Sequence, residues 1–267
     1  MRDSMNRLRL IVAPLSLIGL LLLGTPSAPA GASAGSITAT WAQASPSTSP
    51  AASSGDVMAA VPGGHLLMVE PGRSGGASTT WQWDGLTWTQ QVTTVNPAMP
   101  SAMAYNAKLG KIVLVDPNYQ KTYVWTGADW SLLLSGQGPS TGYGAMAYDQ
   151  NNGQLVYFGG YVSQSVDGRD TWTFDGSSWT QQHPSVSPPG RMMALAQDDP
   201  VSGKVILFSG FSEPGQANYS DTWQWDGSTW TQLHPSTTPS PRNSSTSFVD
   251  QRVQRFFIEG GVTDGGI

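Results

Sequence analysis

Tryptophan recurs at a nearly constant interval, and this spacing restricts the possible folds more than any other feature of the sequence. Trp88, Trp130, Trp179 and Trp230 are separated by 42, 49 and 51 residues, and Trp41 lies 47 residues before Trp88. All 11 tryptophans belong to this series or to the short segments just before its members. A period of about 40 to 50 residues predicts a repeat architecture, with one supersecondary unit in each repeat.

Each repeat contains an aromatic hairpin. An aromatic-x-aromatic segment is followed by Asp-Gly or Thr-Gly and then by the returning tryptophan, in residues 81–88, 123–130, 172–179 and 223–230. Residues two apart in a strand point to the same face, and an Asp-Gly pair favours a hairpin turn. Isolated sheets of this kind would leave their aromatic faces in water, so we expect these side chains to pack between neighbouring repeats.

A second hairpin precedes each aromatic one. A strand of small residues, a polar turn and a strongly apolar strand occupy residues 103–115, 146–158 and 194–208, and residues 57–69 and 248–258 follow the same plan. Small residues then end the apolar strand at Gly159-Gly160, Ser209-Gly210 and Gly260-Gly261. Two hairpins in each repeat make four short antiparallel strands, which is the composition of a β-propeller blade.

The combination of an apolar strand, a diglycine, an aromatic residue and a spaced tryptophan resembles the kelch repeat. Glu70-Pro71 and Asp116-Pro117 replace the diglycine in the first two copies and depart from the motif. The resemblance implies an all-β, kelch-type β-propeller of four-stranded antiparallel blades in residues 35–267. The repeat units are expected at residues 55–91, 100–134, 142–182, 191–233 and 244–267, the last of them incomplete.

About five blades are therefore expected, and the sequence allows two ways in which the ring could close. Residues 36–41 resemble an outer strand that could complete the last unit and close a five-bladed ring. Alternatively, the sequence is a truncated part of a six- or seven-bladed propeller. The stretch rich in Ser, Thr and Pro at 44–54 is expected to be a loop or linker in either case.

Residues 1–34 have the composition of an export signal. Three arginines lie within the first nine residues, an apolar stretch covers residues 10–23, and small residues suited to cleavage surround Ala30 and Ala34. We expect a secreted or extracellular protein; an uncleaved signal that anchors the chain in a membrane is the alternative. The absence of cysteine means that disulfide bonds do not stabilise the fold.

The charge and the motifs argue against several functions. A net charge of −5 with only 12% charged residues disfavours nucleic acid and anionic lipid as partners. Kelch-like propellers include the copper enzyme galactose oxidase, whose cofactor is a tyrosine cross-linked to a cysteine. This chain contains no cysteine, so that cofactor cannot form. His183 and His234 occupy equivalent repeat positions, so a structural role is expected for both. We therefore expect no cofactor, no metal site and no identifiable catalytic residue.

A ligand-binding face is expected where the second strand of each blade leads to the third and where the chain enters the first strand. Aromatic rings beside arginines there would suit a carbohydrate or an acidic peptide. The alternative for Arg191 and Arg242 is that they bond loop carbonyls. The candidate binding residues are Arg73, Tyr119, Tyr143, Tyr161, Arg169, Arg191, Phe211, Tyr219 and Arg242.

The leading functional hypothesis is a non-catalytic binding or adhesion module for a glycan or an extracellular protein. A carbohydrate-active enzyme, related to sialic-acid mutarotases or to the oxidases, is the first alternative. A purely architectural module of a larger surface protein is the second. Fold resemblance alone does not choose among them.

Overall fold

The computed structural model describes residues 45–51, 55–72, 76–118, 120–250 and 254–264. Within these residues every regular element is a β-strand, and no helix is present that is long and apolar enough to cross a membrane. The predicted signal segment 1–34, the predicted strand 36–41 and the candidate residues Arg73 and Tyr119 lie outside the described residues.

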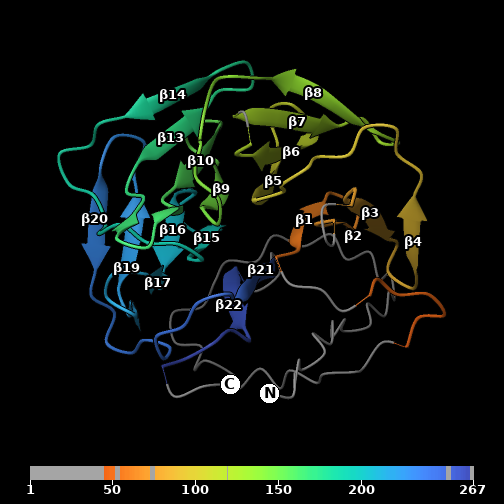
Figure 1. Cartoon of the computed structure of the whole chain (residues 1–267). Helices are drawn as coiled ribbons and strands as arrows, with labels where there is room; N and C mark the ends of the chain where they lie inside the picture. The colour runs from red at the N-terminus through yellow and green to blue at the C-terminus, as the bar shows by residue number, and fades with distance from the viewer. Residues whose placement is uncertain (1–44, 52–54, 73–75, 119, 251–253, 265–267) are drawn as a thin grey trace, which may run out of the picture.

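Four antiparallel four-stranded sheets form the four complete blades, and they follow one another along the chain (Figure 1). The strands of the first two blades are β1 (Val57–Val61), β2 (His65–Glu70), β3 (Thr79–Trp83), β4 (Trp88–Gln91), β5 (Ala102–Asn106), β6 (Lys111–Asp116), β7 (Lys121–Trp125) and β8 (Trp130–Leu134). Those of the next two are β9 (Ala145–Asp149), β10 (Gln154–Phe158), β13 (Thr171–Phe174), β14 (Trp179–Gln182), β15 (Leu195–Asp198), β16 (Val205–Phe208), β19 (Thr222–Trp225) and β20 (Trp230–Leu233).

A fifth sheet consists of β21 (Thr246–Asp250) and β22 (Arg255–Glu259). The first strands of consecutive sheets, β1, β5, β9, β15 and β21, neighbour one another around the centre, while β4, β8, β14 and β20 form the outer edge (Figure 1). This arrangement is a β-propeller and confirms the expected fold class. Among the described residues the fifth sheet consists of two inner strands, which the sequence predicted for this unit.

Most of the core lies between blades, where the apolar side chains of consecutive sheets pack against one another. Apolar side chains of β2 pack with those of β6 and β7, those of β6 pack with β10 and β13, and those of β10 pack with β16 and β19. The tryptophans at the start of β8, β14 and β20 take part in these clusters: Trp130, Trp179 and Trp230 are 2%, 7% and 1% exposed. The prediction that the tryptophans pack between repeats is confirmed for these three residues.

An aspartate closes the aromatic hairpin in three of the four blades. The Asp175 carboxylate accepts the backbone N–H groups of Ser177 and Ser178 at 2.7 and 2.9 Å, and Asp84 and Asp226 form the same pattern. These hydrogen bonds hold the pKa of each carboxyl below its usual value. The aspartates therefore act in turn formation, as expected from their side-chain chemistry.

The connections from the second to the third strand differ in length among the blades. In blades 3 and 4 they fold into two small hairpins, β11 (Tyr161–Ser163) with β12 (Val166–Asp167), and β17 (Phe211–Ser212) with β18 (Ala217–Asn218). The corresponding connections in blades 1 and 2 contain no strand within the described residues. One end of the propeller is therefore built up over blades 3 and 4.

Candidate functional site

We use the name loop face for the end of the propeller where the second strands lead to the third strands and the chain enters the innermost strands. Isolated β-bridges join these two sets of segments within each of three consecutive sheets: Gly142 with Tyr161, Met192 with Phe211, and Asn243 with Val262. Each bridge joins the approach to the innermost strand to the residue after the small-residue pair that ends the second strand. Both sets of segments therefore share one face, as the strand alternation predicted.

The diglycine lets neighbouring blades approach closely at this face. Gly160 has a φ of 109°, and its N–H donates to the carbonyl of Arg191, which belongs to the next blade, at 2.8 Å. A Cβ atom on Gly160 would lie 2.6 Å from the carbonyl oxygen of Gly142. Only glycine combines this conformation with this contact, so the kelch-like glycine pair serves the seam between blades.

Three residues at the start of consecutive innermost strands adopt left-handed backbone conformations. Tyr143, Met193 and Ser244 each precede β9, β15 or β21 by two residues, and their φ angles are 60°, 54° and 54°. We call this set the left-handed arc. A non-glycine residue is uncommon at positive φ, and such strain persists only where the surrounding structure imposes it.

Hydrogen bonds from blade to blade connect the residues of the left-handed arc. The N–H of Met193 donates to the carbonyl of Tyr143 at 2.8 Å, and the N–H of Ser244 donates to that of Met193 at 3.3 Å. Gly55, at the same position in blade 1, also has a positive φ of 86°, whereas Pro100 occupies it in blade 2 and its ring excludes positive φ. The left-handed arc thus belongs to the third, fourth and fifth sheets.

The side chains of the left-handed arc are accessible. Tyr143 is 51% exposed, Ser244 is exposed and Met193 is half-buried. An aromatic ring, a thioether and a hydroxyl therefore stand at equivalent places of three adjoining sheets, on a backbone that hydrogen bonds hold in position. Such a surface offers stacking and hydrogen bonding to a ligand, which are the two contacts that sugars make with proteins.

Hydrogen bonds from aspartate side chains connect the small hairpins to the neighbouring sheets. The Asp167 carboxylate accepts the N–H of Glu213, at 3.1 Å to one oxygen and 3.2 Å to the other, and Asp264 accepts the N–H and side-chain amide of Asn218 at 3.1 and 2.7 Å. Each contact links the hairpin of one blade to the next sheet. The hairpins of blades 3 and 4 are thus connected to each other and to the fifth sheet.

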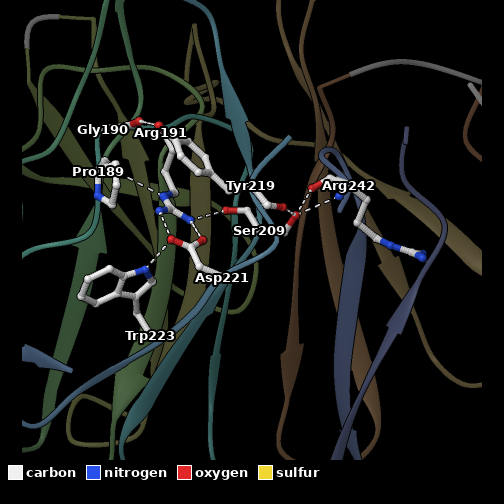
Figure 2. Close-up of polar contacts among 8 residues, drawn as sticks. All are labelled: Pro189, Gly190, Arg191, Ser209, Tyr219, Asp221, Trp223 and Arg242. Atoms are coloured by element: carbon white, nitrogen blue, oxygen red, sulfur yellow. Dashed lines mark hydrogen bonds and ion pairs between the residues drawn. The ribbon is translucent and has the colours of Figure 1, made fainter. Parts of the chain in front are cut away.

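Arg191 lies inside this face and not on it. Its side chain is fully buried, its guanidinium forms a bidentate pair with Asp221 at 2.5 and 2.8 Å, and it also donates to the carbonyls of Pro189 and Ser209 (Figure 2). The ring of Tyr219 lies 4.0 Å from the guanidinium carbon. These contacts match the alternative interpretation, in which Arg191 bonds loop carbonyls. The guanidinium is enclosed and does not lie on the surface.

The charge of Asp221 is maintained by this network. Burial alone would raise the pKa of Asp221, but the hydrogen bonds and charge of Arg191, with the indole N–H of Trp223, outweigh burial and hold the pKa below its ordinary value. The pair therefore stays ionised at neutral pH and fixes the start of β19 against the approach to β15.

Arg242 occupies the equivalent position in the fifth sheet. Its Nε donates to the carbonyl of Ser240 and its Nη1 to that of Gly260, at 3.0 and 2.9 Å. Its backbone joins blade 4, because its N–H donates to the Ser209 hydroxyl (Figure 2). Arg242 is half-buried and has no ion pair within the described residues.

The other predicted site residues divide into two groups. Tyr161, Phe211 and Tyr219 are half-buried on the hairpins, and their backbones are used in bridges or hydrogen bonds. Arg169 is exposed beside the seam between blades 3 and 4. The structure thus brings Arg191 and Tyr219 into direct contact, and it places Tyr143 in the left-handed arc.

Sequence reasoning missed three residues of the loop face: Met193, Ser244 and Asp221. Aligning the repeats would have placed Met193 and Ser244 opposite Tyr143, two residues before each innermost strand. The sequence also shows that Asp221 lies two residues before Trp223. No sequence signal predicts the left-handed conformation, since none of the three arc residues is glycine or asparagine.

The rest of the described residues contains an open cavity and no cluster of metal-ligating side chains. An open cavity of about 400 Å³ lies at the edge of blade 1, lined mainly by Ser78, Thr79, Gln90 and Asn96, and none of the predicted binding residues lines it. No cluster of three potential metal-ligating side chains occurs in the part of the chain that the structure describes. His183 and His234 are both exposed there.

Comparisons with known proteins identify the fold. No family model matches the chain, and no curated protein matches it. Among solved structures, the chain is similar to that described as "Structure of YjhT", with a TM-score of 0.58 and 13% sequence identity over 78% of this chain and 77% of the other. The TM-score supports a shared propeller fold, whereas an identity this low carries no information on function.

Proposed function

We propose that this protein is a secreted, kelch-type propeller that binds a glycan at its loop face, through the left-handed arc and the hairpins beside it. The single observation that carries the proposal is the left-handed backbone of Tyr143, Met193 and Ser244, locked by hydrogen bonds between blades. Backbone strain that recurs at three equivalent positions presents three side chains in a defined arrangement, and strain of this kind is concentrated at functional sites.

The chemistry of the exposed groups favours a sugar over other ligands. The half-exposed ring of Tyr143 can stack on the apolar face of a pyranose, and the exposed hydroxyl of Ser244 can exchange hydrogen bonds with sugar hydroxyls. Two half-buried aromatic residues, Tyr161 after Gly159-Gly160 and Phe211 after Ser209-Gly210, extend the same face. A preorganised backbone lowers the entropy cost of binding.

Export and kelch character are supported by the sequence. The basic and apolar residues at 1–34 have the composition of a leader, and extracellular glycans would be accessible to an exported protein. The glycine pair of blade 3 occupies a blade-to-blade seam, which explains the feature that most resembles a kelch repeat.

A glycan-array screen followed by calorimetric titration tests the proposal. We expect a glycan ligand whose affinity falls about tenfold or more in Tyr143→Ala, which corresponds to about 1.4 kcal/mol, and is largely kept in Tyr143→Phe. Leu86→Ala is the matched control, because Leu86 is 79% exposed in the β3–β4 turn at the opposite end of the blade.

Three outcomes would overturn this proposal. Binding that Tyr143→Ala and Phe211→Ala leave unchanged would move the site away from the loop face. Chemical turnover of the bound sugar would favour the carbohydrate-active enzyme. A folded protein that binds no glycan would favour a protein partner or an architectural role.

A further inference from the structure

The open cavity of blade 1 lies where β3 begins and β4 ends, on the outer side of the first sheet (Figure 1). Its volume of about 400 Å³ is within the range of about 300 to 1,000 Å³ that is typical of small-molecule sites. Ser78 and Thr79 line it at the start of β3, and Gln90 and Asn96 line it at the end of β4 and in the segment that follows. The residues that line the cavity include no charged side chain.

Ser78 brings a buried hydroxyl without a partner to this cavity. Its side chain is only 3% exposed, and its hydroxyl forms no hydrogen bond within the described residues. A buried hydroxyl in this state has given up water and gained nothing in return, which is rare in folded proteins. Because Ser78 lines the cavity, a polar ligand there supplies the hydrogen bond that the fold leaves unmade.

Carboxamide groups lie on β4 and in the segment after it. The side-chain oxygen of Asn96 accepts the hydroxyl of Thr93 at 2.6 Å, which leaves the two N–H groups of Asn96 as donors. Gln90 is half-buried, and its carboxamide carries both a donor and an acceptor. The cavity therefore offers donors and acceptors close together.

The hydroxyl of Thr79 is oriented by a carboxylate behind it. It donates to Glu70 at 2.8 Å, so its proton is already used and its oxygen remains as an acceptor. Glu70 is 8% exposed, and its second carboxylate oxygen has no hydrogen-bond partner within the described residues. A negative charge next to the lining makes the cavity unfavourable for an anion.

We propose that this cavity binds a neutral sugar unit, a hexopyranose that carries neither a carboxylate nor an amino group. Each sugar hydroxyl both donates and accepts, and the hydroxyls and carboxamides of the lining match this chemistry. Val92, which also lines the cavity and is 96% exposed, offers an apolar contact to the C–H groups of the ring. A charged ligand would lose hydration without gaining a counter-charge from the lining. This site is additional to the left-handed arc and does not depend on it.

Trp81 is a reporter for the cavity. Its indole N–H donates to Glu70 at 2.8 Å and lies 3.3 Å from the hydroxyl oxygen of Thr79. We would label the protein with ¹⁵N-tryptophan, assign the Trp81 signal from the spectrum of Trp81→Phe, and titrate glucose, galactose and mannose in turn. At least one of them is expected to shift the Trp81 indole signal until it saturates. The indole of Trp179, which bonds Thr122 between blades 2 and 3, is the internal control and is expected not to move.

Charged derivatives of the sugar that binds test the class of ligand. The corresponding uronate and amino sugar are each expected to bind at least about tenfold more weakly, because the lining holds no counter-charge for either. Tighter binding of the amino sugar would identify a cation site directed at Glu70 and overturn the inference. Tighter binding of the uronate, or no Trp81 shift with any neutral sugar, would also overturn it.

Ser78→Ala gives a result that a structural role for this hydroxyl would not produce. Sugar affinity is expected to fall about three- to tenfold, while the melting temperature stays the same or rises, because the hydroxyl has no partner to lose in the free protein. Thr89→Val, at an exposed position of β4 outside the cavity lining, is the matched control and should keep full affinity. A Ser78→Ala protein with a lower melting temperature and unchanged affinity would contradict the inference. Gln90→Leu, with the same expected loss of affinity, keeps the test decisive if Ser78→Ala does not fold.

Tyr143→Ala separates this site from the proposed function. Tyr143 does not line the cavity, so the Trp81 shift is expected to remain in this variant even where binding at the loop face is lost. Loss of the Trp81 shift in Tyr143→Ala would overturn the second site. Sugar binding that depends on Tyr143 and never moves the Trp81 signal would leave the proposed function standing and overturn this inference alone.

Discussion

The indole N–H of Trp179 donates to the hydroxyl of Thr122, which belongs to the preceding blade, at 2.8 Å. Trp130 bonds Thr80 and Trp230 bonds Thr171 in the same way, at 2.9 and 3.0 Å. In these three repeats the regular tryptophan therefore fills the space between two blades and also forms a polar contact across it. A buried indole N–H needs such a partner, which explains why threonine stands on the facing strand.

Thr122→Val tests this contact, because valine keeps the shape of threonine and removes the acceptor. Thr122 is 1% exposed, so the N–H of Trp179 would lose its partner without gaining water. We expect the free energy of unfolding to fall by about 1 to 3 kcal/mol, measured by urea denaturation. Thr89→Val, at an exposed position of β4, is the control and should have little effect. Equal stability of Thr122→Val and wild type would contradict a structural role for the hydrogen bond.

The ion pair of Arg191 and Asp221 predicts a pH dependence of stability. The pKa of Asp221 lies below its ordinary value in the folded protein, so the pair stabilises the fold above the unfolded pKa of about 4. This contribution is lost as the pH falls through the lower, folded pKa. Urea denaturation of wild type and Asp221→Asn should show a difference in stability at pH 6 that shrinks toward pH 3. A difference independent of pH would contradict the ionised pair.

Replacing Arg191 while keeping Asp221 should lower the free energy of unfolding. Arg191→Met leaves the Asp221 carboxylate in a largely enclosed place without its counter-charge, and we expect a loss of about 3 to 5 kcal/mol at pH 7. Thermal unfolding of this variant should therefore occur well below that of wild type. The double variant Arg191→Met with Asp221→Leu should recover part of the loss, because it removes the unpaired charge. An Arg191→Met protein as stable as wild type would show that the pair is dispensable.

Tyr143 allows a test of the left-handed backbone. Asparagine tolerates a φ of 60°, whereas the branched Cβ of valine does not, so Tyr143→Val should be less stable than Tyr143→Asn by about 1 to 2 kcal/mol. Side-chain contacts contribute little to this difference, because Tyr143 is half-exposed. Differential scanning calorimetry of the two variants measures it. Equal stabilities would exclude a left-handed conformation at this position.

Gly160→Ala should be destabilising beyond the cost of its φ. Its Cβ would lie 2.6 Å from the Gly142 carbonyl, whereas a Cβ on Gly127, at a similar φ of 101°, has no neighbour within 4 Å. Gly127→Ala therefore measures the conformational cost alone, and Gly160→Ala should lose about 1 to 3 kcal/mol more. Comparable urea midpoints for the two variants would argue against a close seam between blades.

Much of the architecture was predictable from the sequence because it depends on local and periodic features. The spacing of Trp88, Trp130 and Trp179, the aromatic-x-aromatic strands and the Asp-Gly turns are visible without a structure, and together they predicted four complete blades and two strands of a fifth. Strand alternation also predicted which loops share a face. These features are set by the two-residue period of a strand and by turn chemistry, which act over a few residues.

The character of the candidate site depended on contacts between residues far apart in the sequence. Arg191 and Arg242 have similar surroundings in the sequence, yet one is enclosed by Asp221, 30 residues away, and the other stands half-exposed with a neutral partner. Tyr143, which has a positive φ, likewise accepts a hydrogen bond from Met193 of the next blade. The sequence alone determined the blade and its packing pattern, because periodic burial needs only local order. The tertiary structure decided which polar groups are paired, because pairing depends on how the blades meet.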